Sequence, residues 1–414
     1  AISTAAGEPL ARGAARRTHG MADDAIDAWL RLIRAPGLGG TGTRRLLASL
    51  GSAQAVVGAN AAQLRAAGAP DITIQWFDAP DTDALAADRA WLDASPNHHL
   101  ITCDSADFPT LLKRAQRAPA ALFVAGDPQW LWFAQIAIVG SRNPTDGGIA
   151  NARDFSRALA RSGLVVTSGL ADGIDAAAHR AALVVGQATV AVVATGPDLV
   201  YPTRNRALAD AIMAQGAIVT EYPPGTPAQR QNFPMRNRII AGLTLGTLVV
   251  EAAQRSGALI TAREAAESGR EVFALPGSIH NPLAKGCHRL IREGAALVET
   301  AQEIIEAIGP RAQELATALR GRLTEGPTAS SGDAAAAAGP EEDADYRRLR
   351  AALGHDPVPI DVLAQRTGLT VETLSSMLIL MELDGRVAAA HGRYALRHHG
   401  GSGTRHHPAQ AEDG

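Results

Sequence analysis

The pattern of apolar and polar positions predicts alternating strands and helices in the middle of the chain. An apolar run at 136–139 ends at Gly140, and a second short run covers 164–167. Between them, apolar residues recur at helical spacing over 149–160. Two parallel strands need a crossover of this kind, so the pattern predicts a strand–helix–strand unit.

The same alternation continues to about residue 300. Further strands are predicted over 189–194, 217–222, 247–251, 271–275 and 296–298, and further helices over 204–215, 258–267 and 285–293. Repeated strand–helix alternation with short links predicts an α/β sheet with helices on both faces, a doubly wound architecture that fills residues 135–309.

The segments before this domain have a different pattern. Residues 1–22 are expected to be a disordered extension, and 23–96 an N-terminal helical domain. Within it, 36–40 breaks two helices in a helix-hairpin-helix pattern, whose backbone amides can hold a DNA phosphate. A tight corner used only for packing explains the pattern equally well. Residues 97–134 are expected to be an extended connector into the central domain.

The segments after it are also distinct. Residues 310–345 are rich in Ala, Gly, Glu and Asp and predict a flexible linker. The pattern of 346–397 is typical of a winged helix-turn-helix. Its expected recognition helix, 371–383, has no basic residue near its start, so a protein contact is as good an interpretation as duplex reading. Residues 398–414 are expected to be a disordered tail.

Composition narrows the chemistry. The formal net charge is -3, so any site for a polyanion must be a local patch. Lys113 and Lys285 are the only lysines, so phosphate contacts must be made mainly by guanidinium groups. Two cysteines, Cys103 and Cys287, suit a reducing cytoplasm and make no metal cluster by themselves. No apolar run approaches transmembrane length. We expect a cytoplasmic protein with no membrane segment, no metal and no cofactor.

The loop after the first strand of the central domain is the first candidate site. It reads Gly140-Ser141-Arg142 and lacks the spaced glycines of a dinucleotide fingerprint. In doubly wound sheets, ligands sit beyond the carboxyl ends of the strands. An arginine there favours phosphate binding, although an ordinary surface arginine remains the alternative.

A predicted loop at 225–238 is the second candidate. It carries Arg230, Arg236 and Arg238, with Phe233 among them and no acidic residue. Arginines interleaved with an aromatic ring suit single-stranded nucleic acid, whose phosphates need charge and whose bases need a stacking face. The loop follows a strand end, so we expect it to converge with Arg142 at one sheet edge. The alternative is that Phe233 fills the core and the arginines are solvated.

Catalytic patterns are weaker. Asp175 and His179 are four residues apart on a predicted helix and have the spacing of an acid–base pair. Asp175 also lies in the first helical turn, where the helix dipole stabilises a carboxylate, and we favour that structural role. Ser168 lacks the G-x-S-x-G pattern, and no P-loop lysine is present.

Ordered motifs carry a family resemblance. They are GSR…T…G (140–148), SGLADGIDAAAH (168–179), a TG-D-YP--N stretch (195–205), TEYPPGTPAQRQNFPMRNRIIAGL (220–243), VVEAAQRSGALITAREAAESGREVFALPG (249–277) and KGCHRLIREGA (285–295). In these motifs the chain resembles the DprA family, also called Smf. The resemblance implies an extended Rossmann-like domain that binds single-stranded DNA, forms homodimers, loads the recombinase RecA in natural transformation and has no catalytic activity.

The resemblance also implies site residues. Those for DNA are Gly140, Ser141, Arg142, Ser168, Gly169, Arg230, Phe233, Arg236, Asn237 and Arg238. Those for the dimer face are His288, Leu290 and Leu297, and many relatives have Asn in place of His288. A nucleotide-processing enzyme of the lysine-decarboxylase-like group is the alternative from another class. Its PGG-x-GT-x-x-E signature is not matched, because residues 251–264 have no paired glycines.

Overall fold

The computed structural model describes residues 22–324, 344–353, 358–369, 374, 377–378, 387–390 and 393–396. The expected extension (1–22, except Ala22), the tail (398–414) and most of the expected recognition helix lie outside the described residues. The chain divides into two compact units, Ala1–Gly326 and Pro327–Gly414. Among the described residues, no helix is both long enough and apolar enough to cross a membrane.

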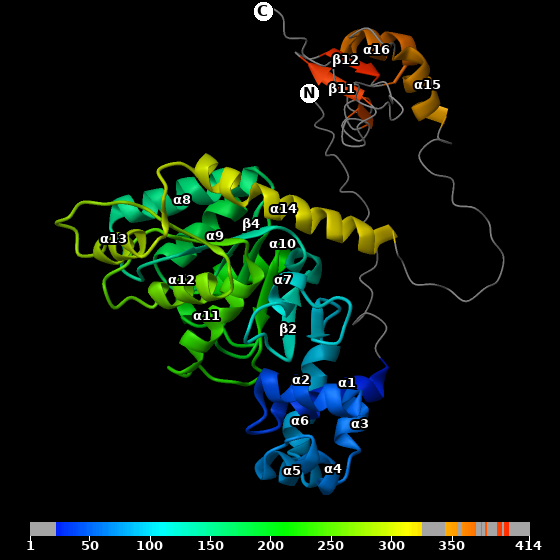
Figure 1. Ribbon diagram of the computed structural model, residues 1–414, viewed down its shortest axis with the longest axis vertical. Helices are drawn as coiled ribbons and strands as arrows, with labels where there is room; N and C mark the ends of the chain where they lie inside the picture. The colour runs from blue at the N-terminus through cyan, green and yellow to red at the C-terminus, as the bar shows by residue number, and fades with distance from the viewer. Residues whose placement is uncertain are drawn as a thin grey trace, which may run out of the picture. The chain divides into compact units, whose positions relative to one another are not determined.

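A nine-stranded sheet forms the centre of the first unit (Figure 1). Its strands are β1 His98–Thr102, β2 Ala121–Gly126, β3 Gln135–Val139, β4 Val165–Ser168, β5 Thr189–Val192, β6 Ala217–Thr220, β7 Gly246–Val249, β8 Glu271–Ala274 and β9 Ala296–Leu297. The order across the sheet is β1-β2-β6-β5-β4-β3-β7-β8-β9. Strands β3 to β9 are parallel, whereas β1 and β2 pair antiparallel at one side. The predicted α/β sheet is confirmed.

Alternate residues of the strands supply two cores, because successive side chains point to opposite faces. In β3, Ile136 and Ile138 pack with helices α8 Asp146–Arg161, α9 Ile174–Val184 and α14 Ala301–Thr324. On the opposite face, Ala137 packs with α11 Asn232–Leu243, while Val139 packs with α12 Ala258–Glu267 and α13 Lys285–Arg292. Helix α10 Arg206–Gln215 packs with β5 and β6. Figure 1 shows α8 and α14 on one side of the sheet and α11 and α12 on the other.

The segment 97–134 differs from the expected connector. It contributes β1, β2 and the short helix α7 Thr110–Lys113, so it is part of the sheet. All residues of β2 are buried, and Phe123 is in register with Thr220 of β6. Such a short, continuous apolar run is consistent with a fully buried strand, although its periodicity does not distinguish it from other buried segments.

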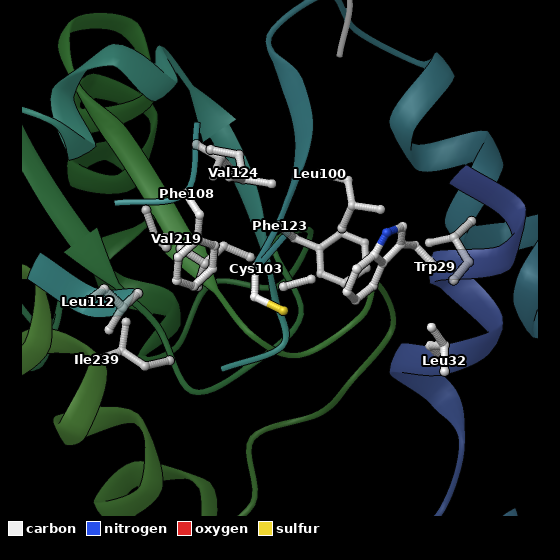
Figure 2. Packing of buried hydrophobic residues seen from close by; sticks show 14 of the residues in the cluster. Trp29, Leu32, Leu100, Cys103, Phe108, Leu112, Phe123, Val124, Val219 and Ile239 are labelled. Atoms are coloured by element: carbon white, nitrogen blue, oxygen red, sulfur yellow. The ribbon is translucent and has the colours of Figure 1, made fainter. Parts of the chain in front are cut away.

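The N-terminal helices share a core with these two strands. They are α1 Asp23–Arg34, α2 Gly39–Leu50, α3 Ala53–Val57, α4 Ala61–Ala66, α5 Asp71–Asp78 and α6 Thr82–Asp93. Figure 2 shows Trp29 of α1 close to Phe123 of β2, within one continuous cluster. At the hairpin between α1 and α2, a Cβ added to Gly40 would lie 2.5 Å from the carbonyl oxygen of Ala118. This close approach supports the packing interpretation of the hairpin.

Helix α14 differs from the expected linker, because it continues to Thr324 despite Pro310 in its interior. Ile304 and Ile308 are buried, and Ala312 and Leu315 pack partly buried against the same core. Tertiary packing of an apolar face therefore outweighs the loss of one backbone hydrogen bond at the proline.

The second unit contains α15 Ala344–Ala352, β10 Val358–Pro359, α16 Ile360–Thr367, β11 Val387–Ala390 and β12 Arg393–Leu396. Its strands form an antiparallel sheet in the order β10-β12-β11. Leu349, Leu363 and Val387 are fully buried in its core. Helices beside a small antiparallel sheet are the elements of a winged helix.

Candidate nucleic-acid interface

A cavity of about 520 Å³ opens at the carboxyl edge of the sheet. Its lining includes Arg142, Arg230, Phe233, Arg236 and Asn237, all of which the resemblance implied, together with Tyr201, Pro234, Ile240, Gly257, Ile260 and Thr261. Segments that follow β3, β5, β6 and β7 therefore converge on one site, as expected for the carboxyl edge of a doubly wound sheet.

The first loop presents Arg142 to this cavity. Gly140 and Ser141 are half-buried, whereas Arg142 is exposed. Gly173, at the start of α9, has a φ of 76°, and a Cβ there would lie 2.7 Å from the carbonyl oxygen of Arg142. Only glycine adopts this conformation at such close range without strain. The loop backbone is therefore packed tightly against the start of α9 while the Arg142 side chain stays accessible.

Two aromatic rings lie beside Arg142. The guanidinium carbon of Arg142 is 5.5 Å from the centroid of the Phe233 ring, within range of a cation–π interaction. The rings of Phe233 and Tyr201 have centroids 5.6 Å apart and are tilted by 57°. Tyr201 is 50% exposed and Phe233 is half-buried. Phe233 is therefore part of the cavity lining, which favours the stacking interpretation over the core interpretation.

Arg236 differs from the expectation of a loop arginine. Helix α11 begins at Asn232, so Arg236 lies within a helix, and it is only 4% exposed. Its Nη1 donates to the carbonyl oxygen of Gly169 at 2.7 Å and also to that of Val192. A Cβ added to Gly169 would lie 2.6 Å from the same guanidinium, so this buried contact requires glycine. Arg236 thus joins α11 to the ends of β4 and β5.

Burial also governs the charge of Arg236. It lowers the pKa of the guanidinium to about 10; the nearby charge of Asp175 opposes this effect and that of Arg142 adds to it. The group therefore remains positive at neutral pH. It supplies a fixed charge beneath the cavity, while Arg142 and Arg230 are the exposed ones.

Arg238 lies away from the cavity lining. It is 8% exposed and forms an ion pair with Glu221. Its Nη1 donates to the carbonyl oxygen of Arg117 at 2.5 Å. These contacts hold α11 against the segment between α7 and β2, so the structure does not bring Arg238 together with the other predicted residues.

The remaining predicted residues form the support of the site. The hydroxyl of Ser168 donates to the carbonyl oxygen of Ile138 at 2.6 Å. Asn237 accepts from Nε of Arg236 at 3.2 Å. Both bonds are buried, so Ser168 fixes the end of β4 against β3, and Asn237 orients the Arg236 side chain under the cavity.

Asp175 and His179 do not form a catalytic pair. The Asp175 carboxylate accepts from the backbone amides of Gly169 and Ala171 at 3.2 and 3.3 Å. His179 is fully buried, and its Nδ1 donates to the hydroxyl of Thr189 at 2.8 Å, because that hydroxyl donates its own proton to a backbone carbonyl. Burial raises the pKa of Asp175 and lowers that of His179 to about 3. Both are structural groups.

The N-terminus of α8 is closed to a nucleotide phosphate. Thr145, the N-cap residue, donates its backbone N–H and its hydroxyl to the Glu251 carboxylate at 2.9 and 2.7 Å. Glu251 is 7% exposed, so its negative charge occupies the place where dinucleotide-binding domains hold a pyrophosphate. A nucleotide phosphate on this helix would meet like charge.

The predicted dimer residues lie at the opposite end of the sheet from β1. Leu297 ends β9, the outermost strand there, and is 49% exposed. Leu290 lines a cavity of about 400 Å³ beside that edge. His288 is half-buried, with Nε2 3.0 Å from the carbonyl oxygen of Gly277. Leu290 and Leu297 are thus accessible at the cavity and the edge, and His288 contacts its own chain.

Tyr201 and Ile260 are among the lining residues that were not predicted from the sequence. Tyr201 follows β5, and a Tyr-Pro pair after a strand end was the available signal, since an aromatic residue at a ligand-bearing edge is a stacking candidate. Ile260 lies in the first turn of α12, within an ordinary amphipathic pattern that does not distinguish it as a site residue.

The fold and the cavity define an α/β protein whose site combines accessible guanidinium groups with aromatic rings and has no catalytic pair among the described residues that line it. The model of the family "DNA recombination-mediator protein A" matches residues 99–309, and that of the DprA winged helix domain matches 333–393. The chain belongs to this family, DprA/Smf.

Individual relatives agree. Protein Smf of Escherichia coli is 42% identical over 75% of this chain and 80% of its own length. DNA processing protein DprA of Streptococcus pneumoniae is 46% identical over 48% of this chain and 70% of its own length. The X-ray structure of DprA from S. pneumoniae superposes with a TM-score of 0.61 at 35% identity, covering 68% of this chain and 97% of that chain.

Proposed function

We propose that this protein binds single-stranded DNA in the cavity at the carboxyl edge of the sheet. The observation that carries the proposal is the Arg142 guanidinium over the Phe233 ring, with Tyr201 beside it. A guanidinium binds a phosphate, and an adjacent ring stacks on a base that is free of its partner strand. Stacking contributes about 1–3 kcal/mol per base and depends little on base identity.

Single strands suit this site better than duplex. In a duplex the faces of the bases are already stacked on one another, so rings inside a cavity have nothing to contact. Arg142 and Arg230 would neutralise phosphates, and the charge of buried Arg236 adds to the attraction from below. The nucleotide-processing alternative is disfavoured by Glu251, whose carboxylate fills the N-terminus of α8.

The recombination role follows from the family. We propose that this protein loads RecA onto the strand it binds, in the cytoplasm and without catalysing a reaction itself. Natural transformation is the process that the family resemblance suggests. Stimulation of RecA filament formation on single strands is the direct measurement, and a protein that binds DNA but leaves filament formation unchanged would contradict the RecA step alone.

We also propose a homodimer through α13 and β9. Exposed Leu297 on the outermost strand, and Leu290 in the cavity next to that strand, offer apolar side chains that a second copy can cover symmetrically. Leu297→Arg would place two like charges at that contact, and light scattering is expected to show monomers. Leu199→Arg changes another exposed leucine, in the segment after β5, and is the control that should leave the dimer intact.

The central experiment compares Arg142→Ala with Arg161→Ala, an exposed arginine at the far end of α8. Fluorescence anisotropy on a labelled single strand should show about tenfold weaker binding for Arg142→Ala, equivalent to about 1.4 kcal/mol. The slope of log affinity against log salt should fall by about 0.7, the value for one phosphate of a single strand. Arg161→Ala should match the wild type. An unchanged affinity and slope for Arg142→Ala would rule out this site.

A further inference from the structure

The carboxyl edge carries exposed apolar side chains beyond the cavity itself. Met235 near the start of α11 is 43% exposed, Ile260 at the start of α12 is 38% exposed, and Ile279 in the segment after β8 is 74% exposed. These segments follow β6, β7 and β8, so they all begin at the same edge of the sheet. Exposed apolar residues on neighbouring segments of one edge indicate a binding surface.

Basic residues accompany them on the side toward β9. Arg255 lies in the segment after β7, the strand that pairs with β3 and therefore neighbours the loop of Arg142. Arg255 is exposed, and no hydrogen bond or ion pair engages its side chain within the described part of the chain. Gly257, two residues later, already lines the cavity. Lys285, exposed at the start of α13, follows β8.

Most carboxylates of this edge are already engaged. Asp172 pairs with Arg204, and Asp198 accepts from the backbone amide of Gly225 at 2.9 Å. Glu251 is bound to Thr145. Asp146 is exposed but belongs to the first turn of α8, where the helix dipole offsets its charge. The route from Arg142 to β9 crosses three strand spacings, about 14 Å. Exposed Arg255 and Lys285 add two cations along it, and exposed Glu299 lies at its far end, after β9.

We propose that a single strand bound in the cavity continues over Arg255 and Ile279 toward the β9 edge. This inference rests on the proposed function and specifies its path. Arg255 and Lys285 contact successive phosphates, while Ile260 and Ile279 support bases whose faces are no longer stacked. Charge for the backbone together with apolar contact for the bases is the general requirement of single-strand binding.

The test uses the full chain and two labelled strands, one of about 5 nucleotides that the cavity can accept and one of about 20 nucleotides that extends beyond it. Arg255→Gln and Ile279→Ser should each bind the short strand within twofold of the wild type and the long strand about fivefold more weakly. For Arg255→Gln the salt slope on the long strand should fall by about 0.7. Arg161→Gln is the matched control, expected to leave both strands unaffected.

Each outcome decides between site and path. If Arg255→Gln leaves both strands unaffected, the path is wrong even when Arg142→Ala still weakens binding of both strands. If Arg255→Gln weakens both strands equally, Arg255 belongs to the cavity and the path is again wrong. If Arg142→Ala changes neither strand, the proposed function itself fails. If Ile279→Ser produces monomers in light scattering, Ile279 is part of a protein interface and not of the path.

Discussion

Arg142 and Arg236 lie at the same edge of the sheet, but Arg142 is exposed and Arg236 is buried. Arg142, on the loop after β3, is exposed and stands over an aromatic ring. Arg236, one turn into α11, is buried and donates hydrogen bonds to backbone carbonyls. The Arg142 side chain is accessible to a ligand, whereas the Arg236 side chain holds the ends of β4 and β5 together. Residue type and place in the topology therefore do not identify an arginine that binds a ligand. Such an arginine is identified by N–H donors that form no hydrogen bond within the protein.

The largest effect that separates the two is on stability. Arg236→Ala removes the hydrogen bonds that this side chain donates to the carbonyls of Gly169 and Val192, and leaves Asp175 buried without its nearby positive charge. Removing one member of a buried charged network costs about 3–5 kcal/mol of unfolding free energy. Arg142→Ala, an exposed loop change, should stay within about 0.5 kcal/mol. Chemical denaturation monitored by circular dichroism measures both values.

The opposite result would remove the distinction. If Arg236→Ala unfolds at the same denaturant concentration as the wild type and loses DNA affinity instead, Arg236 is a ligand-binding group and its buried contacts are secondary. Arg236→Lys sharpens the test, because a lysine retains the charge but offers no planar fork for two carbonyls. It should recover only part of the lost stability.

A second test concerns pH and the buried groups under the cavity. The folded-state pKa of His179 is about 3, below the ordinary value of 6.5, because burial and the charges of Arg236 and Arg180 disfavour its protonated form. Below pH 6.5 the unfolded chain therefore binds more protons than the folded one, so stability falls as pH falls. By about pH 5 the loss from this group should reach about 2 kcal/mol.

The raised pKa of buried Asp175 works in the other direction, since its protonation at low pH relieves a buried charge. His179→Gln isolates the histidine. The difference in unfolding free energy between wild type and variant should shrink steadily from pH 7 to pH 5. A difference that stays constant over this range would mean that His179 is accessible to protons in the folded state.

Part of the fold and of the site could be predicted from the sequence. The alternation of apolar runs and helical spacing predicts the strands from β3 to β9, because β3 to β7 are buried throughout and form continuous apolar segments in the sequence. The loop of Arg142 was found because its place after a strand is fixed by topology. The strands β1 and β2 were not predicted. They pair antiparallel, so no crossover helix between them marks them in the sequence pattern.

Burial of Arg236 and Arg238 was not predictable for a different reason. Pro224, Pro227 and Pro234 predict a loop for their segment. The helix nevertheless begins at Asn232, with Pro234 in its first turn, where the missing N–H costs nothing. Which helix face then turns inward depends on β4, β5 and the segment near Arg117, all distant in sequence. Local pattern cannot supply those contacts.

The smallest expected effect tests whether Arg142 and Phe233 act together on DNA. Arg142→Lys keeps the charge, so the salt slope should remain that of the wild type, but lysine lacks the planar donor fork and the flat group that stacks on a ring. Phe233→Leu keeps apolar volume and removes the ring. Each variant should bind a single strand about threefold more weakly.

Because the guanidinium lies 5.5 Å from the ring centroid, the double variant should lose less binding free energy than the sum of the two single variants. The coupling free energy in this double-mutant cycle should be about 0.5 kcal/mol, below the loss of about 0.65 kcal/mol that a threefold effect represents. Pairing Arg142→Lys with Phe133→Leu, an exposed phenylalanine in the segment before β3, should give additive effects. Additive losses for Arg142 and Phe233 as well would show that the two residues contact the strand independently, and the arginine–ring pair would then have no part in binding.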